Sequence, residues 1–482
     1  MNLTRDPWIP AVRSDGTRDL LGLDDLFAQA HTLSDLAVKP HERIALMRLL
    51  LCITQAALDG PANEEDWEIC APLIQPRVAE YLGKWRLKFE LFGDGERFLQ
   101  AKPGVLASPD PVMEDEGISR LNLNLASGES NATLFDNAAS GTREFTPAEA
   151  ALSLLTYQSF SPLLGRGYKG RSPCADSSML HTFVRGASLL ETIHLNVLNR
   201  TDILDSYGYH PNDRPVWEVF TGKKLTIPAE ESLIKGYLGR LVPLARSIWI
   251  ETLCTMRLAN GIVYDGIRES GYREAAATVL VTAKGHVVLQ ANLEKAAWRD
   301  LSAICVKNKA GHATVSGPIA FKNPFCAEEI SIWTAGIVSD QAKIRDVVEA
   351  SYAVPRFLLD DQPSRVAYER GIIHSEKVEF ALERAVGEYA KALQSKAPTA
   401  KAKQQFWTWV EQSLPALFDV AHELTTDEEL PKSKWGQAVQ AAALDAYRQV
   451  CPSQTPRQIQ AHALGLRRLS FNTTSKFAKP KK

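Results

Sequence analysis

A glycine-rich basic loop is the first segment of the chain whose residue types and spacing could do chemistry. It has the pattern G-x-G-x-x-G, which occurs in dinucleotide-binding turns, and it comprises Gly165, Arg166, Gly167, Tyr168, Lys169 and Gly170. Glycines let backbone N–H groups approach a ligand closely, and the two cations add positive charge. The tyrosine could stack on a base or a ribose. The loop therefore suits a phosphate-bearing ligand, either a nucleotide cofactor or a nucleic acid.

The sequence around this loop argues against a nucleotide cofactor. A dinucleotide site needs a buried strand before its first glycine and a helix that starts at its last. Here Pro162 stands where a central strand tolerates proline poorly, and Arg171-Ser172-Pro173 follows without apolar helical spacing. We therefore expect no cofactor. The residues alone leave two interpretations, a loop against a nucleic-acid backbone or a solvated connector, and they favour the connector.

Patterns for hydrolytic or metal chemistry are absent from the sequence. The ten histidines form no H-E-x-x-H or metal-spaced cluster, and no G-x-S-x-G occurs. His181 and His194 stand in apolar settings typical of core histidines, whereas Asp213, Glu230 and Glu231 are ordinary loop and helix-start carboxylates. The seven cysteines form no C-x-x-C pair, so we expect neither a disulfide framework nor a metal site. An unrecognised hydrolase stays an alternative, which metal-dependent turnover by the isolated chain would revive.

Composition and charge are those of a globular protein. The chain has 482 residues, of which 45% are hydrophobic and 23% charged, and its formal net charge is −2. That length allows two or more domains. Near-neutrality excludes a protein that coats nucleic acid over its whole surface, but it is compatible with a local basic groove. No signal-peptide pattern and no window of eighteen apolar residues occurs, so we expect a cytoplasmic protein with no membrane contact.

Apolar periodicity predicts an α+β fold with a large mixed N-terminal domain, residues 1–361. We expect a strong helix over 40–58, ended by Gly60-Pro61, and a second over 148–158 that leads into the glycine loop. The β-branched runs of 278–293 flank a short turn, as in a hairpin. The domain should therefore combine small antiparallel sheets, helices and long irregular loops.

The composition and apolar spacing of the sequence change beyond Asp360-Asp361-Gln362-Pro363-Ser364. Amphipathic, Ala- and Leu-rich segments with short breaks follow at 366–394, 402–423, 431–450 and 456–467. Short links between such helices predict an antiparallel four-helix bundle over residues 362–482.

Three sequence blocks resemble a known family. The start MNLTRDPWIP, the segment LFGDGERFLQ and above all HTFVRGASLLETIHLNVL are similar to the large subunit, CasA, of the type I-E CRISPR Cascade complex. The order along the chain also fits, because the glycine loop comes just before TFVRG and the helices come last. The resemblance covers nearly the whole chain.

This resemblance implies a non-catalytic subunit of an RNA-guided antiviral surveillance complex. Such a subunit reads the protospacer-adjacent motif (PAM) in double-stranded DNA, initiates strand separation and R-loop formation, and helps recruit a helicase–nuclease. The implied partners are target DNA, the guide-RNA ribonucleoprotein with its backbone and small subunits, and the helicase–nuclease effector. An architectural subunit that assembles partners without reading DNA is the alternative.

The resemblance also assigns residues to DNA. The glycine loop falls on residues 165–170, and a glutamine wedge falls on Asp340, Gln341, Ala342 and Lys343 within GIVSDQAKIRD. The family commonly has Asn before this glutamine. Because a carboxylate would repel phosphate, we expect Asp340 to cap a helix beginning at Gln341, so that Lys343 and Arg345 face DNA.

Two more segments follow from the resemblance. A basic finger that enters the minor groove is assigned to Arg268, with Arg257 and Arg273 as alternatives, and each could instead form a surface salt bridge. A long loop over about 128–147 should touch the guide complex, with Phe135 and Asn137 matching the family's aromatic-x-Asn.

Overall fold

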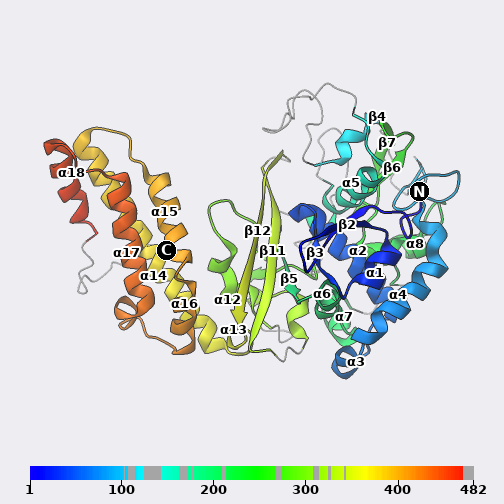
Figure 1. Cartoon of the computed structure of the whole chain (residues 1–482), viewed down its shortest axis with the longest axis horizontal. Helices are drawn as coiled ribbons and strands as arrows, with labels where there is room; N and C mark the ends of the chain where they lie inside the picture. The colour runs from blue at the N-terminus through cyan, green and yellow to red at the C-terminus, as the bar shows by residue number, and fades with distance from the viewer. Residues whose placement is uncertain are drawn as a thin grey trace. The chain divides into compact units, whose positions relative to one another are not determined.

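The computed structural model describes residues 1–102, 104–106, 114–123, 143–161, 172–175, 178–208, 213–266, 274–307, 314–323, 327–340 and 343–469. The chain divides into two compact units, which we call the N-terminal unit (Met1–Val354) and the helical unit (Pro355–Lys482) (Figure 1). The predicted boundary at 361–362 lies one short helix further along, after α13 (Phe357–Asp360). The predicted class, mixed α and β with small antiparallel sheets and a C-terminal helical region, is confirmed.

Small sheets make up the β structure of the N-terminal unit. Within the described residues each has three strands, in the orders β2-β1-β3, β4-β7-β6, β12-β11-β5 and β10-β8-β9. The strands are β1 (Ile9–Arg13), β2 (Arg18–Leu21), β3 (Leu33–Leu36), β4 (Glu114–Gly117), β5 (His181–Arg185), β6 (Arg246–Ile250), β7 (Thr255–Asn260), β8 (Val279–Thr282), β9 (Gly285–Val288), β10 (Val315–Ser316), β11 (Glu329–Asp340) and β12 (Lys343–Pro355). The hairpin predicted within 278–293 is confirmed as β8–β9, with Thr282 opposite Gly285.

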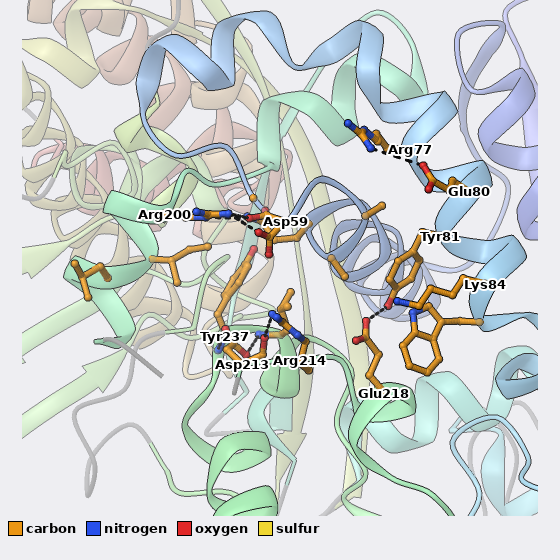
Figure 2. Close-up of a pocket in the computed structure, with 18 of the residues that line it drawn as sticks. Asp59, Arg77, Glu80, Tyr81, Lys84, Arg200, Asp213, Arg214, Glu218 and Tyr237 are labelled. Atoms are coloured by element: carbon orange, nitrogen blue, oxygen red, sulfur yellow. Dashed lines mark hydrogen bonds and ion pairs between the residues drawn. The ribbon is translucent and has the colours of Figure 1, made fainter. Parts of the chain in front are cut away.

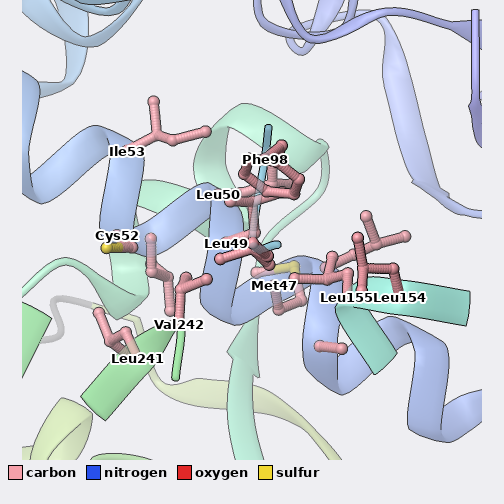
Figure 3. Packing of buried hydrophobic residues seen from close by; sticks show 14 of the residues in the cluster. Met47, Leu49, Leu50, Cys52, Ile53, Phe98, Leu154, Leu155, Leu241 and Val242 are labelled. Atoms are coloured by element: carbon pink, nitrogen blue, oxygen red, sulfur yellow. The ribbon is translucent and has the colours of Figure 1, made fainter. Parts of the chain in front are cut away.

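Helix α2 (Pro40–Leu58) runs through the core of the N-terminal unit. It begins at a proline, whose missing N–H is no loss in a first turn, and it ends at the left-handed residues Asp59 and Gly60, as the sequence predicts. Apolar side chains surround it on several sides, which is typical of a fully buried helix. Figure 3 shows part of this packing, with residues of α2 beside Phe98, Leu154, Leu155, Leu241 and Val242.

The other helices in the described part of the N-terminal unit are shorter than α2. They are α1 (Leu23–Gln29), α3 (Glu64–Ile69), α4 (Ala71–Trp85), α5 (Pro147–Phe160), α6 (Leu189–Asn196), α7 (Arg200–Tyr207), α8 (Val216–Val219), α9 (Ile227–Lys235), α10 (Tyr237–Leu241) and α12 (Leu301–Ile304). Helix α5 is the predicted helix before the glycine loop. Thr146 and Glu149 form a capping box at its start, which satisfies N–H groups that would otherwise lack partners.

The helical unit contains the predicted helical segments, with one correction. Its helices beyond α13 are α14 (Gln362–Leu393), α15 (Thr399–Glu411), α16 (Leu414–His422), α17 (Lys434–Val450) and α18 (Pro456–Leu466). The single helix expected over 402–423 is wrong, because α15 ends at Glu411 and α16 starts beside Pro415. Proline has no N–H to continue a helix but fits the first turn of a new one. None of the described helices is long and apolar enough to cross a membrane.

Candidate nucleic-acid interface

A long β-hairpin carries the predicted wedge. Strand β11 ends at Asp340 and β12 begins at Lys343, and the two run side by side as a yellow-green ribbon in Figure 1. Gln341 and Ala342 lie outside the described residues. We expected Asp340 to cap a helix that begins at Gln341. This prediction is wrong, because Lys343 already belongs to strand β12. Both flanking runs are rich in β-branched residues and pair within a sheet, and a two-residue link joins antiparallel strands well.

The hairpin is held to the core by an ionic and aromatic network. Arg43 of α2 lies 3.5 Å from Asp35 of β3 and 3.8 Å from Glu349 of β12, and its guanidinium sits 5.0 Å from the ring centroid of Trp333. The indole N–H of Trp333 donates to Glu349 at 3.1 Å. Arg185 of β5 also binds Asp35, at 2.9 Å. The network joins β3, α2, β5 and both hairpin strands, so it orients the hairpin base.

The segment that follows the glycine loop touches the hairpin near its tip. The backbone N–H of Ser339 donates to Ser178 Oγ at 3.0 Å, and the two hydroxyl oxygens are 3.1 Å apart. A few residues back, a Cβ on Gly336 would lie 2.6 Å from Ala291 Cβ and 2.7 Å from the Met179 carbonyl oxygen. Glycine is therefore needed at 336 for β11 to approach this segment so closely.

The glycine loop itself, Gly165 to Gly170, lies outside the described residues, but both of its ends are described. Upstream, α5 ends at Phe160 and Ser161 is buried. Downstream, the buried Ser172 donates its hydroxyl to the Ser159 carbonyl. The two ends of the loop are thus fastened together. The preceding element is a helix rather than a strand, which agrees with the prediction that this is not a dinucleotide turn.

The chain length between these contacts limits how far apart the two predicted DNA segments are rooted. An extended chain covers at most about 3.5 Å per residue, so Ser172 lies within roughly 21 Å of Ser178. Ser178 in turn contacts Ser339, two residues before Gln341. With the reach of the Ser178 side chain and its hydrogen bond added, the roots of the glycine loop and of the wedge are separated by no more than roughly 28 Å, the length of about eight base pairs of duplex.

The basic-finger candidates divide between described and undescribed residues. Arg268 and Arg273 lie in the segment 267–273, outside the described residues. Arg257 lies on β7 and forms a half-exposed ion pair with Glu251 at 2.6 Å. That is the surface salt bridge expected as its alternative role, so the structure gives Arg257 a partner other than DNA.

The structure describes residues on both sides of the predicted guide-complex loop. Phe135 and Asn137 lie outside the described residues. On the near side, the N–H of Ile118 donates to the Cys254 carbonyl at 2.9 Å, and on the far side the N–H of Phe145 donates to the Leu253 carbonyl at 2.9 Å. The described residues on either side of 124–142 are thus attached to the turn between β6 and β7.

Residues weighed for hydrolytic chemistry have structural roles. His194 stacks on Trp67 with ring centroids 4.6 Å apart. Asp213 accepts the N–H groups of Tyr237 and Leu238 at the start of α10. Burial, together with the charge of Arg48, lowers the pKa of His181 to about 4, so this histidine is neutral near pH 7. No group of three or more metal-ligating side chains occurs among the described residues.

A cavity of about 600 Å³ opens beside the C-terminal end of α2 (Figure 2). Its charged lining is largely paired internally, since Arg200 binds Asp59 at 2.6 Å and Arg77 lies 3.7 Å from Glu80. Tyr81 donates its hydroxyl to Glu218. The described lining contains no histidine, cysteine, serine or threonine, and none of the predicted DNA residues belongs to it.

Comparison with known proteins decides the family. The family model described as CRISPR-associated protein Cse1 matches residues 2–446. The chain belongs to the Cse1 family. The resemblance to CasA predicted from the sequence is thereby confirmed, because the curated CasA/Cse1 of Thermus thermophilus is 28% identical over 500 aligned residues, which cover 93% of this chain and 91% of that protein.

Solved structures of Cse1 proteins share the fold. A crystal structure of Thermus thermophilus CasA superposes with a TM-score of 0.74 at 22% identity, covering 97% of this chain and 98% of that one. A chain from a CRISPR RNA-guided surveillance complex superposes with a TM-score of 0.70 at 18% identity, covering 97% and 99%. The similarity therefore spans both units of this Cse1 family member.

Sequence reasoning missed charged residues that join distant segments of the N-terminal unit. Neither Arg43 nor the buried ion pair of Arg48 with Glu274 was predicted, although Arg48 stands within an apolar run of α2. A cation on the apolar side of a predicted helix signals a buried partner, because an unpaired buried charge is very costly. The sequence gives no indication of which carboxylate that partner is.

Proposed function

We propose that this chain is a non-catalytic subunit of an RNA-guided surveillance complex and reads a PAM in double-stranded DNA. Its DNA contacts would be the glycine loop at 165–170, a basic residue such as Arg268 and the wedge at Gln341. Membership in the Cse1 family supports the first part, since a chain of the same fold comes from a CRISPR RNA-guided surveillance complex. The hydrogen bond from Ser339 to Ser178 supports the second part, because it ties the strand that leads to Gln341 to the segment that follows the glycine loop and so limits how far apart the two are rooted.

The physical work assigned to each segment differs. The minor groove distinguishes A·T from G·C better than base from base, so a glycine loop and one cation suffice for a short, degenerate motif. The longer sequence is read by pairing with the guide RNA. Gln341, which comes between β11 and β12 in the sequence, would replace stacking beside the PAM and lower the cost of opening the first step, which is a few kcal/mol.

The other predicted segments would serve assembly. The loop that contains Phe135 and Asn137 would contact the guide complex, and the helical unit would dock on the small subunits. The chain would also help recruit the helicase–nuclease once the R-loop has formed. These roles need no bond to be made or broken by the chain, which is consistent with the structural roles of the histidines and carboxylates described above.

The test is Gln341→Ala in the reconstituted complex. We expect PAM-duplex binding to be partly retained and R-loop formation to fall about tenfold, the effect of losing about 1.4 kcal/mol. Permanganate footprinting of the displaced strand measures the opening. The matched control is Gln404→Ala, an exposed glutamine on α15 of the helical unit, which should leave opening unchanged.

Two outcomes would contradict the proposal. If Gln341→Ala opens DNA as well as the unaltered chain does, Gln341 is not the wedge. If the complex discriminates a correct from a scrambled PAM equally well with and without this chain, the chain is an architectural subunit and does not read DNA.

A further inference from the structure

One exposed face of α14 repeats its residue types every seven positions. In three successive repeats an apolar side chain is followed four residues later by a basic one, and a further lysine continues the basic series. We call this face the α14 stripe, and its residues are Val366, Arg370, Ile373, Lys377, Phe380, Arg384 and Lys391. Because seven residues make nearly two helical turns, the side chains form one line along the helix, over roughly 38 Å.

The apolar members of the stripe do not belong to the core of the helical unit. Helix α14 packs its other faces against α15, α16, α17 and α18, whereas Val366, Ile373 and Phe380 are 39%, 42% and 60% exposed. The guanidinium of Arg384 lies 6.0 Å from the ring centroid of Phe380, so charge and apolar surface are adjacent. A single exposed apolar residue is ordinary, but several in register on one helix face indicate a surface for another molecule.

The basic members of the stripe have no carboxylate partner among the described residues. Acidic residues of α14 pair instead with cations of neighbouring segments, Glu383 with Lys403 of α15 at 3.2 Å and Glu388 with Arg468 at 3.2 Å. Glu369, near the start of α14, is also exposed, but the basic side chains outnumber it. The stripe therefore presents an excess of positive charge interleaved with apolar surface.

The spacing and the charge of the stripe indicate what kind of partner fits it. A nucleic-acid backbone would bind the cations but would leave aliphatic side chains such as Val366 and Ile373 without contacts. A second helix that crosses at a shallow angle presents its own side chains every seven residues, so apolar residues can interlock and acidic ones can lie beside the cations. The chain's own end, 470–482, is basic and has no acidic residue, and a second copy of the stripe is basic too, so both would be repelled.

We propose that the α14 stripe is the docking surface of the helical unit and that its occupant is an amphipathic helix of a partner protein. That helix carries apolar residues at seven-residue spacing with Asp or Glu beside them. This inference rests on the proposed function, in which the helical unit docks on the small subunits, and it names the face and the chemistry of that contact. The apolar side chains supply most of the affinity, and the cations set orientation and association rate.

The experiment measures the affinity of the full-length chain for the guide-RNA ribonucleoprotein assembled without it. Ile373→Ala with Phe380→Ala should weaken binding at least about tenfold in low and in high salt. Both side chains are exposed, so the Tm of the free chain should be unchanged. The matched control is Ile459→Ala with Leu464→Ala on α18, where the side chains are 55% and 42% exposed, and it should bind fully.

Three results of this apolar comparison would overturn the inference. Full binding by the Ile373→Ala and Phe380→Ala variant would mean that the stripe is not the docking surface. An equal loss in the α18 control would mean that α14 has no special part in docking. A lower Tm of the free variant would mean that the stripe is covered within the chain itself.

A second variant tests the charge of the partner. Arg370→Ala, Lys377→Ala and Arg384→Ala together should weaken binding about tenfold in low salt and much less at about 1 M salt, where exposed charges are screened. No effect in low salt would contradict an acidic partner. If this variant weakens binding and the apolar variant does not, nucleic acid occupies the stripe and the inference is wrong. If the variants behave as expected but the complex shows no PAM preference, the proposed DNA reading fails and the docking surface stands.

Discussion

The two units differ in whether they bury charged side chains. The N-terminal unit buries Arg48, Arg240, Arg246 and Glu274 completely. In the helical unit, as far as Leu469, no Lys, Arg, Asp or Glu is fully buried, and ion pairs such as that of Lys403 with Glu383 lie at the surface. The helical unit is therefore held mainly by apolar packing along its helices. The N-terminal unit also uses directional polar bonds between distant segments, as a scaffold must when it presents several loops to one ligand.

Truncating the buried cation should give the largest difference between the units. Arg48→Ala leaves Glu274 in the core without its partner, which costs about 3–5 kcal/mol. Burial works to raise the pKa of Glu274, whereas the charge of Arg48 and its hydrogen bond help to hold that pKa below its ordinary value, so the loss of Arg48 should raise the pKa of Glu274. Hydrogen exchange of the full chain should show lost protection in the N-terminal unit and little change in the helical unit. Equal loss in both units would show that they are not independent.

Acid should also weaken the N-terminal unit first. Burial, with the charge of Arg48, lowers the pKa of His181 to about 4, and burial, with the charge of Lys39, does the same for His41. The unfolded chain takes up these protons first, so each contribution is complete above about pH 6.5 and is lost as the pH falls towards 4. At about 1.36 kcal/mol per pKa unit, each histidine would cost up to about 3 kcal/mol.

The measurement is denaturant unfolding of the full chain at pH 7 and pH 5, with hydrogen exchange to locate the effect. His181→Phe keeps an aromatic ring in β5 and should reduce the pH dependence. In the helical unit, His374 is only half-buried, and burial lowers its pKa as well. A larger acid loss in the helical unit would reverse the expected order.

The same contrast explains which elements could be predicted from the sequence. Helix α14 follows from local spacing and from Asp361, which caps its first turn through the Ser364 N–H at 2.9 Å. The hairpin tip was predicted wrongly because Asp340-Gln341-Ala342-Lys343 has the residue types of a capped helix start. Pairing of β11 with β12 overrides that local preference.

The candidate site was predictable only in part. The glycine loop, Arg268, Phe135 and Gln341 lie outside the described residues, so their roles remain predictions, and the structure defines the roots that carry them. Those roots depend on contacts such as Ser178 with Ser339, which join segments far apart in the chain. Gly336 was the one residue that could have indicated this contact from the sequence, because a glycine inside a β-branched run indicates that another backbone approaches closely.

A methyl group at the hairpin's close approach should have a smaller effect than acid. In Gly336→Ala the new Cβ meets Ala291 Cβ and the Met179 carbonyl oxygen, so the hairpin must shift, at a cost of roughly 1–3 kcal/mol. DNA opening should fall with it, as permanganate footprinting would show. The control is Gly387→Ala in α14, where nothing lies within 4 Å and alanine should stabilise the helix by about 0.5–1 kcal/mol. If the Gly336→Ala variant opens DNA as well as the unaltered chain does, the hairpin does not need this close approach to Ala291 and Met179 in order to act.

Removing a surface charge from the helical unit should have the smallest effect. Lys403 on α15 lies 3.2 Å from Glu383 and 3.6 Å from Glu379 of α14, and its side chain is 38% exposed. Water and salt screen such pairs, so Lys403→Ala should lower the free energy of unfolding by less than about 1 kcal/mol. Denaturant unfolding in low and high salt measures it, and the difference from the unaltered chain should shrink further at about 1 M salt, where the Debye length is about 3 Å. A loss as large as that of Arg48→Ala would mean that the helical unit also depends on specific ion pairs, and the contrast between the two units would then be wrong.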